Sequence, residues 1–378
     1  MLRRGRIPEL LLAALLLGGA AAFGAAGPSA KAGLFLAILA LGVGTAIVAL
    51  GRRERLRVPA VVWPLAGMLL LGSAQLVSGW SVYPWATKAQ ITEIAVWIVL
   101  AMTARNLLAA PTARRAFCDV LLWGAAAIAV AALLYRALDP AAPRFGPFTN
   151  PNHYAVFAEL TLPLAIAAAA GERRFWGLLL TGLLYGSVIA SGSRAGAVIA
   201  TAEVALIPLL LSHKAGIGAA VRNATVTAIV AVLGAAAAGW HFLWERFGSS
   251  ALLAGRLEIL QSALVLVAAH PWTGTGLGTF EVVYPAAAPF DPGLRVDHAH
   301  NDLLEAAVEG GIPLAALCLA AVAVTLSKAR HAPWMWGAYA ALLHSLVDFP
   351  LHIPALAALT VTLLSISSRR HATNPLRR

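Results

Sequence analysis

One stretch in the last third of the chain crowds together the side chains that acid–base chemistry uses. Residues 297–311 read Asp-His-Ala-His-Asn-Asp-Leu-Leu-Glu-Ala-Ala-Val-Glu-Gly-Gly. Three of its acids, Asp302, Glu305 and Glu309, recur at i, i+3 and i+7 and so share one face of a helix. Carboxylates that enter an apolar helix are costly unless they line a polar cavity or find partners. The spacing therefore predicts a polar site at the start of this helix.

The two histidines ahead of these acids, His298 and His300, are the candidates for proton transfer. An imidazole titrates near neutral pH, which suits a general base or a contact to phosphate. A metal site made by the histidines and the acids is the alternative, but no third ligand stands at a recognisable spacing. We include His298, Asn301, Asp302 and Glu309 among the substrate-binding candidates.

Two arginines elsewhere in the chain stand where they could hold an anion. Arg194 follows Ser193 in the turn Ser-Gly-Ser-Arg-Ala-Gly, beside hydroxyls and backbone amides that suit a phosphate oxygen. Snorkelling of Arg194 to lipid headgroups is the alternative. Arg256 stands two residues before Glu258, so a local ion pair is the alternative for this second arginine.

Other polar clusters border apolar runs. Arg144, Asn150 and Asn152 lie just before one run, where an asparagine could cap a helix or contact a ligand. Asp348 lies in the turn His-Ser-Leu-Val-Asp-Phe-Pro-Leu-His and could orient a histidine or an arginine, or cap a helix.

Three further features could suggest other activities. The glycine-rich segment 274–278 has no strand before it and no lysine after it, so it predicts a shaping turn rather than a nucleotide loop. Glu159 and Glu203 lie within apolar runs, where they could mark a transport pathway or form buried structural pairs.

The composition places these clusters in a membrane protein. Of the 378 residues, 60% are hydrophobic and 12% are charged, with a mean hydropathy of +0.78. Soluble domains are less apolar and carry about a quarter charged residues. The net charge of +11 does not indicate nucleic acid, because cytoplasmic loops of membrane proteins collect Lys and Arg. Cys118 and Cys318 have no metal or redox spacing and are interpreted as small buried hydrophobes.

The apolar runs predict an all-α integral membrane fold of about 12 transmembrane helices. A span needs about 20 apolar residues. Runs of this kind, some of them short, lie near 8–26, 33–50, 59–78, 90–109, 116–136, 152–170, 174–190, 194–211, 219–239, 303–326, 333–347 and 351–367. The first run follows a basic start and could be a signal peptide, but we expect a retained span because the topology then closes.

The basic residues predict the orientation. Segments on one side of the alternating spans hold 20 of the 28 Lys and Arg residues, which places both termini in the cytoplasm. Residues 257–269 are too short for a further span, and residues 250–270 predict a helix packed at the membrane surface. Residues 240–302 then form one large periplasmic loop between spans nine and ten, within a single polytopic domain of residues 1–378. The polar clusters all fall on this non-cytoplasmic side.

The ordered set of motifs resembles the bacterial O-antigen ligase and O-antigen polymerase family. The resemblance runs from about residue 140 to 355. It is carried by Phe-Thr-Asn150-Pro-Asn152, Ser-Gly-Ser193-Arg194-Ala-Gly, Gly255-Arg256, His270-Pro-Trp-Thr-Gly-Thr-Gly-Leu-Gly-Thr-Phe280, His298-Ala-His300-Asn301-Asp302 through Glu309-Gly-Gly311, and Val347-Asp348-Phe-Pro-Leu.

The resemblance implies an inner-membrane glycosyltransferase of the C-type class that acts in lipopolysaccharide biosynthesis. Such proteins take glycan from undecaprenyl diphosphate on the periplasmic side, without a metal, a nucleotide or another cofactor. Ligases pass the glycan to lipid A–core, and polymerases pass it to another lipid-linked repeat. By motif, the functional arginine pair maps to Arg194 and Arg256, and the catalytic histidine maps to His300.

We therefore expect a metal-independent, inverting ligase with membrane lipid around it and no nucleic-acid partner. The arginines would stabilise charge on the leaving diphosphate, and His300 would receive the acceptor's proton. Leu314 stands where the ligase pattern has a second glycine, which leaves the acceptor open between lipid A–core and another repeat. A polytopic transporter is the rival class, although its site is expected near the bilayer midplane.

Overall fold

The described part of the chain is helical throughout. The computed structural model describes residues 7–140, 142–171, 173–212, 216–239, 243–244, 251–289, 295–329 and 332–366. Within them, Phe145 and Phe148 form an isolated β-bridge, and the other named elements are helices. These are α1 Ile7–Ala21, η1 Phe23–Ala25, α2 Pro28–Gly51, α3 Val62–Val77, α4 Pro84–Leu107, α5 Pro111–Leu138, α6 Pro151–Ala169, α7 Arg174–Ser191, α8 Arg194–Ser212, α9 Ile217–Ala238, α11 Ala251–Ala269, α12 Phe280–Ala287, α13 Asp302–Ala329, α14 Pro333–His344, η3 Pro350–His352 and α15 Pro354–Ser365.

Proline begins six of the α-helices, α2, α4, α5, α6, α14 and α15. The first helical position has no intrahelical partner for its N–H, so a residue without this donor loses nothing there. At α6 the preceding residue, Asn150, also accepts a hydrogen bond from the backbone N–H of Asn152 at 2.9 Å. The helix-cap interpretation of Asn150 is therefore confirmed.

Helix α6 forms the centre of the bundle and packs against α7, α8 and α14. Sixteen of its 19 residues are buried. Glycine lets neighbouring helices approach closely, as is common among membrane helices. A Cβ on Gly337 of α14 would lie 2.4 Å from the backbone oxygen of Leu160, and one on Gly234 of α9 would lie 2.1 Å from that of Gly182 in α7.

The apolar helices identify a membrane protein. Among the described residues, six helices are long and apolar enough to cross a bilayer: α2, α5, α7, α8, α9 and α13. Helices α1, α3 and α15 are apolar but shorter. All twelve predicted runs contain a helix, yet the structure supports six spans by length and composition rather than twelve. Runs near 333–347 and 351–367 give helices of only 12 residues, because turns and prolines interrupt them.

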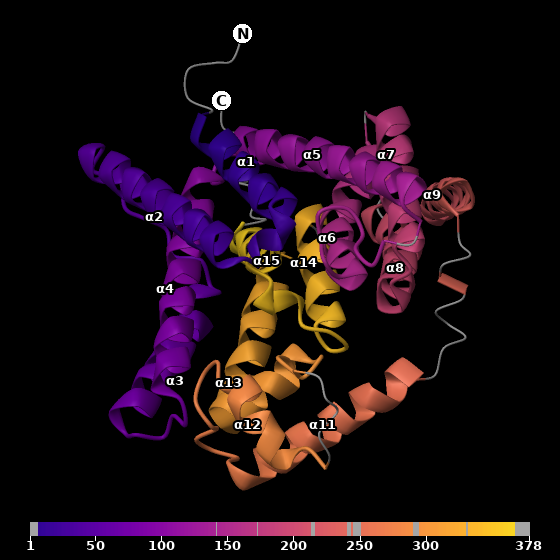
Figure 1. The fold of residues 1–378 in the computed structure, drawn as a ribbon. Coiled ribbons are helices and arrows are strands. Elements are labelled where there is room, and N and C mark those ends of the chain that lie inside the picture. Colours follow the sequence, from indigo (N-terminus) through magenta and orange to yellow (C-terminus); the bar gives the residue numbers. More distant parts are fainter. Residues whose placement is uncertain are drawn as a thin grey trace.

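The predicted external loop contains folded structure where it is described. Helices α11 and α12 pack against the first half of α13 around Ala263, Leu266, Phe280 and Val308. Figure 1 shows α11 and α12 at the lower end of the molecule, away from α1 and α5. Parts of the loop, including Trp240, Arg246 and Phe290, lie outside the described residues.

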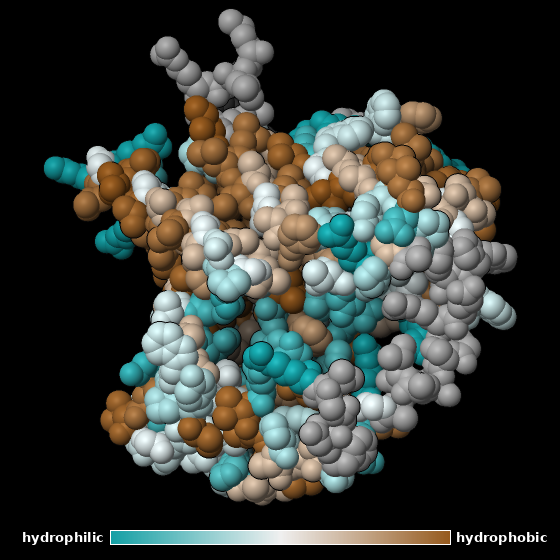
Figure 2. Space-filling view, in the orientation of Figure 1, coloured by the Kyte–Doolittle hydropathy of each residue, from teal (hydrophilic) through white to brown (hydrophobic). Residues whose placement is uncertain are grey.

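The glycine-rich segment is a shaping turn. Gly274, Gly276 and Gly278 all have positive φ, and backbone groups of the segment bond to Val308 O and Glu309 O. From α3, Gln75 donates to Thr273 O and Glu309 O at 2.7 Å each. The segment therefore fastens α3 to α13. Figure 2 shows hydrophilic residues gathered in the hollow of this face around α13 and α14, with mostly hydrophobic helices above.

Candidate active site

A histidine and an aspartate from two separate segments form the first polar centre. His300 Nδ1 lies 3.1 Å from Asp348 Oδ1. The aspartate side chain is 1% exposed and the histidine side chain is 27% exposed. An ionised carboxylate can only accept, so His300 Nδ1 carries the proton and a neutral ring leaves Nε2 unprotonated. No hydrogen-bond partner from the described segments meets Nε2. This pair, the His300–Asp348 dyad, presents a free basic nitrogen.

Asp348 is held in place by a side chain of α6 and by the backbone of its own turn, in addition to His300. Its Oδ2 accepts from Asn152 Nδ2 of α6 at 2.5 Å, and its Oδ1 accepts from the Phe349 backbone N–H at 3.0 Å. Burial alone would raise the pKa of Asp348, but the hydrogen bond from His300 and nearby cationic groups, including Arg256, hold that pKa well below its usual range. The carboxylate is therefore charged when it orients the imidazole.

The start of α13 is pinned to the turn that carries Asp348. The backbone N–H of Asp302 donates to Ser345 O at 2.8 Å, and Asn301 Oδ1 accepts from the Leu304 N–H at 2.9 Å as a helix cap. His300 itself has φ of +52°, in the left-handed region. This turn of backbone directs the imidazole to Asp348 rather than along the helix.

A second cluster of histidines and acids lies next to the dyad. Both ring nitrogens of its central histidine, His352, lie beside carboxylates. His352 Nδ1 lies 2.8 Å from Asp302 Oδ1, and His352 Nε2 lies 3.1 Å from Glu305 Oε1. Glu305 also accepts from His298 Nδ1 at 2.9 Å and from the Ala299 N–H at 2.7 Å. We call this group the His352 cluster, made of His298, Asp302, Glu305 and His352.

The central ring of the His352 cluster is an imidazolium. Both of its nitrogens lie near carboxylate oxygens, and an ionised carboxylate only accepts, so a proton on each nitrogen suits both contacts. Burial alone would lower the pKa of His352, but Glu305 and Asp302 raise that pKa to about 10. The cluster is thus a charged clamp between α13 and η3.

Phe349 lies between the two histidine groups. Its ring stacks on His298 with centroids 4.4 Å apart, and it meets the edges of His153 and His300 at 4.9 and 5.0 Å. The phenyl ring therefore separates the dyad from the His352 cluster and fixes the tilt of His300.

The His352 cluster is also the group in the described chain that could hold a metal ion. His298, Glu305 and His352 each offer a ligand atom, and these atoms lie within 4.8 Å of one another. The same atoms are already satisfied by one another when His352 is protonated. The hydrogen-bonded network accounts for the cluster, and the expectation of a metal-free site stays a prediction.

Of the two predicted arginines, Arg256 contacts the turn of the dyad directly. Its Nη1 donates to Val347 O at 3.1 Å, which brings α11 to the residue before Asp348. Arg194 begins α8 directly after Ser193, whose buried hydroxyl caps the helix by accepting from the Gly196 N–H at 3.1 Å. Tyr154 of α6 and Ser187 of α7 are joined at 2.7 Å, so this hairpin lies at the same end of the bundle as Asn152.

The remaining predicted residues have structural contacts. Arg144 donates to the Tyr135 hydroxyl at 2.8 Å and lies over the rings of Phe23 and Tyr135. Glu309 is buried and accepts from the Phe280 N–H at 3.2 Å, so it helps to hold α12. Their roles in substrate binding stay predictions.

The sequence interpretation missed His352, His153 and Phe349. His352 and Phe349 belong to the turn that was noticed for Asp348, but only the folded chain brings them to residues about 50 positions earlier. A histidine four residues after the aspartate, with a proline between them, was the available signal.

The two glutamates within apolar runs have different environments. Glu159 is fully buried and pairs with His344 Nδ1 at 2.9 and 3.1 Å, as a structural pair would. Glu203 is buried, and within the described residues neither of its carboxyl oxygens has a hydrogen-bond partner.

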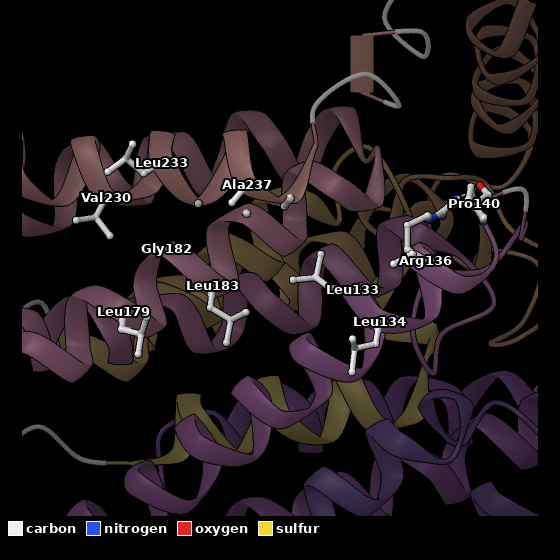
Figure 3. A pocket seen from close by; sticks show the side chains of 14 residues that line it. Leu133, Leu134, Arg136, Pro140, Leu179, Gly182, Leu183, Val230, Leu233 and Ala237 are labelled. Carbon is white, nitrogen blue, oxygen red and sulfur yellow. Dashed lines mark hydrogen bonds between the residues drawn. The ribbon is translucent and has the colours of Figure 1, made fainter.

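A groove of about 750 Å³ between α5, α7 and α9 is not suited to this chemistry (Figure 3). Its lining is mostly apolar and includes Leu133, Leu183 and Val230. Of the described residues that line it, Arg136 alone is charged. Such a wall fits an apolar chain rather than a sugar. The candidate groups for the predicted chemistry lie instead at the end of the bundle that carries the dyad.

Comparison with known proteins agrees with the predicted resemblance. Residues 178–319 match the family described as O-antigen ligase. This stretch contains Arg194, Arg256 and His300, whereas Asn152 and Asp348 lie outside it. The match confirms the resemblance for these residues. No curated protein matches the chain.

Proposed function

We propose that this chain, which carries an O-antigen ligase domain over residues 178–319, moves glycan from undecaprenyl diphosphate to an acceptor hydroxyl. The observation that carries the proposal is the His300–Asp348 dyad, because it offers an oriented, partly exposed base inside a membrane protein. Its Nε2 has no hydrogen-bond partner in the described part of the chain and can receive a proton, and Arg256 of α11 donates to the turn that carries Asp348. The reaction is direct displacement without a metal or other cofactor.

The dyad supplies the base of the reaction. The acceptor hydroxyl gives its proton to His300 Nε2 as its oxygen forms a bond to the anomeric carbon. The bond from that carbon to the diphosphate oxygen breaks, so the sugar inverts and the electron pair leaves with the diphosphate. Asp348 stabilises the imidazolium that forms and keeps the proton of Nδ1 in place.

The arginines supply charge for the leaving group. A departing diphosphate gains negative charge in the transition state, where fixed guanidinium groups are most effective. Arg256 is held by the turn of the dyad, and Arg194 stands at the positive end of α8. These two residues are the diphosphate-binding pair in our proposal.

The proposed topology is twelve spans in the bacterial inner membrane, with both termini in the cytoplasm and the dyad facing the periplasm. A helix in every predicted run and the crowding of the dyad, the His352 cluster and Asn150 at one end of the bundle support it. Tilted, kinked or shortened helices can still cross where the bilayer adapts. Labelling of single cysteines placed at residues 31 and 88 from outside the cell would test this orientation.

Transfer in detergent solution tests the proposed activity. The wild-type protein, mixed with a lipid-diphosphate glycan and a hydroxyl acceptor, should form product although no sealed compartment exists. His300→Ala should lower the rate by about 10²- to 10⁴-fold, and Arg194→Ala or Arg256→Ala by about 10²- to 10³-fold each. Lys88→Gln, an exposed cation elsewhere in the chain, is the control and should keep the rate.

Normal transfer by all three variants would overturn the assignment. A requirement for sealed vesicles, with movement but no transfer, would favour the transporter class.

The acceptor separates two forms of this activity. We propose lipid A–core as the acceptor, which makes the protein a ligase; a polymerase that joins lipid-linked repeats is the alternative. A deletion strain distinguishes them, because a missing ligase leaves long chains on the lipid carrier and a missing polymerase leaves single repeats on the core. Leu314, buried in α13, is the position where this chain departs from the ligase pattern.

A further inference from the structure

A basic pocket lies at the end of the bundle opposite to the dyad. It has a volume of about 600 Å³ and is formed by the starts of α5, α7 and α14 and by the end of α6. Helix α6 begins beside Asp348, and its 19 residues rise about 28 Å. The pocket therefore belongs to the other face of the membrane and takes no part in the proposed transfer.

The residues that line the basic pocket change from charged to apolar along its depth. Arg114 and Arg115 stand in the first turn of α5, and Arg173 directly precedes α7. Leu122 and Leu180 line it two turns further along the same helices. A molecule with an anionic head and an apolar body matches this order.

Arg114 is fixed before any ligand arrives. Its Nη1 donates to Leu108 O and Ala109 O at 3.3 and 2.8 Å, at the end of α4, and its guanidinium lies 5.8 Å from the centre of the Trp334 ring. A positioned guanidinium binds a phosphate with less loss of side-chain freedom than a mobile one. This is the feature that distinguishes the pocket from a scatter of surface arginines.

The pocket also keeps an excess of positive charge. Arg173 pairs with Asp119 at 2.8 Å, which leaves the charges of Arg114 and Arg115 without a carboxylate among the described lining residues. Trp123 and Trp176 line the same pocket, meet edge to face at 5.6 Å and are about half exposed. Tryptophans of this kind gather at the level of lipid headgroups.

We propose that the basic pocket binds an anionic glycerophospholipid of the surrounding membrane. The phosphate lies between Arg114 and Arg115, and the acyl chains follow Leu122 and Leu180 into the bilayer. Basic pockets between membrane helices at the cytoplasmic face bind such headgroups, with each arginine adding to the attraction. This site is independent of the proposed transfer reaction.

Lipid titration of the delipidated full-length protein tests the site by native mass spectrometry. Phosphatidylglycerol should bind at least 10-fold more tightly than phosphatidylcholine with the same chains. The double change Arg114→Gln/Arg115→Gln should weaken phosphatidylglycerol binding by about 30-fold, since each cation near a headgroup contributes about 5-fold. The single change Arg115→Gln should weaken phosphatidylglycerol binding by about 5-fold. Its side chain is exposed, so this variant should fold normally and shows whether the loss in the double variant comes from misfolding.

The matched control is Arg52→Gln/Arg55→Gln, which removes two exposed arginines at the same end of the bundle. Arg57, two residues later, bonds to Asn106 at the end of α4, which places this loop beside the pocket. Binding should stay within 2-fold of wild type. Equal binding of the two lipids, or equal losses in the control and the pocket variants, would overturn the proposal. Full competition by soluble glycerol phosphate would overturn the assignment to a lipid.

Discussion

The His300–Asp348 dyad and the His352 cluster use the same side chains within one small region, yet they differ in the number of ring nitrogens that are occupied. His300 has one nitrogen on a carboxylate, and its other nitrogen has no hydrogen-bond partner among the residues that the structure describes. His352 has both nitrogens beside carboxylates, and these carboxylates raise the pKa of His352 to about 10. The first arrangement can accept a proton, and the second joins α13 to η3. Neighbouring histidine–acid pairs therefore cannot be assigned the same role from residue type alone.

The sharpest test of this difference replaces each of the two histidines by glutamine in separate variants. His300→Gln removes the base and should lower transfer by about 10²- to 10⁴-fold while the protein stays folded. His352→Gln keeps the base and should retain more than about a tenth of the activity per folded molecule, because it touches no reacting atom. Rates should be normalised to folded protein from size-exclusion peaks. Similar losses in both variants would show that the two groups act together.

A second matched pair compares the two aspartates. Asp348→Asn keeps the shape but removes the charge that orients His300, so kcat should fall on the order of 10²-fold with KM little changed. Asp302→Asn should mainly affect stability, since its contacts are to His352 and the Leu351 N–H. Steady-state kinetics give kcat and KM for the two variants. A larger kcat loss for Asp302→Asn would reverse the assignment of the two groups.

The clamp role predicts a stability effect at His352. His352→Gln leaves Asp302 and Glu305 without their shared cation, and loss of a partner from a buried pair is strongly destabilising. Because His352 is partly exposed, we expect a loss of about 2 kcal/mol, visible as a lower apparent melting temperature in detergent. His300→Gln should change this temperature little. An unchanged melting temperature for His352→Gln would contradict the clamp.

The last test of the clamp is the dependence of stability on pH. The folded-state pKa of His352 is raised to about 10 from an ordinary 6.5, so its stabilisation is complete below pH 6.5 and is lost as pH rises to about 10. Melting temperatures across this window should fall for wild type and fall less for His352→Gln. Parallel curves for the two proteins would mean that His352 is not the titrating group.

The sequence could predict where the helices lie and which polar clusters border them, because hydrophobic runs and turn residues are local signals. It could not predict that α14 and α15 are too short by themselves to span. Their prolines and the turn at 345–353 act within runs whose composition looks continuous. The helix-cap role of Asn150 could be predicted as well, because the cap directly precedes its own helix.

Contacts between distant segments were not accessible in this way. Glu159 and His344 lie 185 positions apart, and their pairing depends on how α14 packs on α6. His352 belongs to a cluster because the turn at 345–353 packs against the start of α13. The resemblance to a family pointed to His300, and the turn pointed to Asp348 as a residue that could orient a histidine or an arginine, but the pairing of these two residues required the fold.

The left-handed backbone of His300 has a consequence for engineering. A residue with a side chain is disfavoured there by roughly 1–2 kcal/mol, whereas glycine is not. The contacts of the imidazole with Asp348 and Phe349 therefore have to offset this strain. His300→Gly removes the strain and both contacts together, and it should lower transfer by about 10²- to 10⁴-fold, as His300→Ala does.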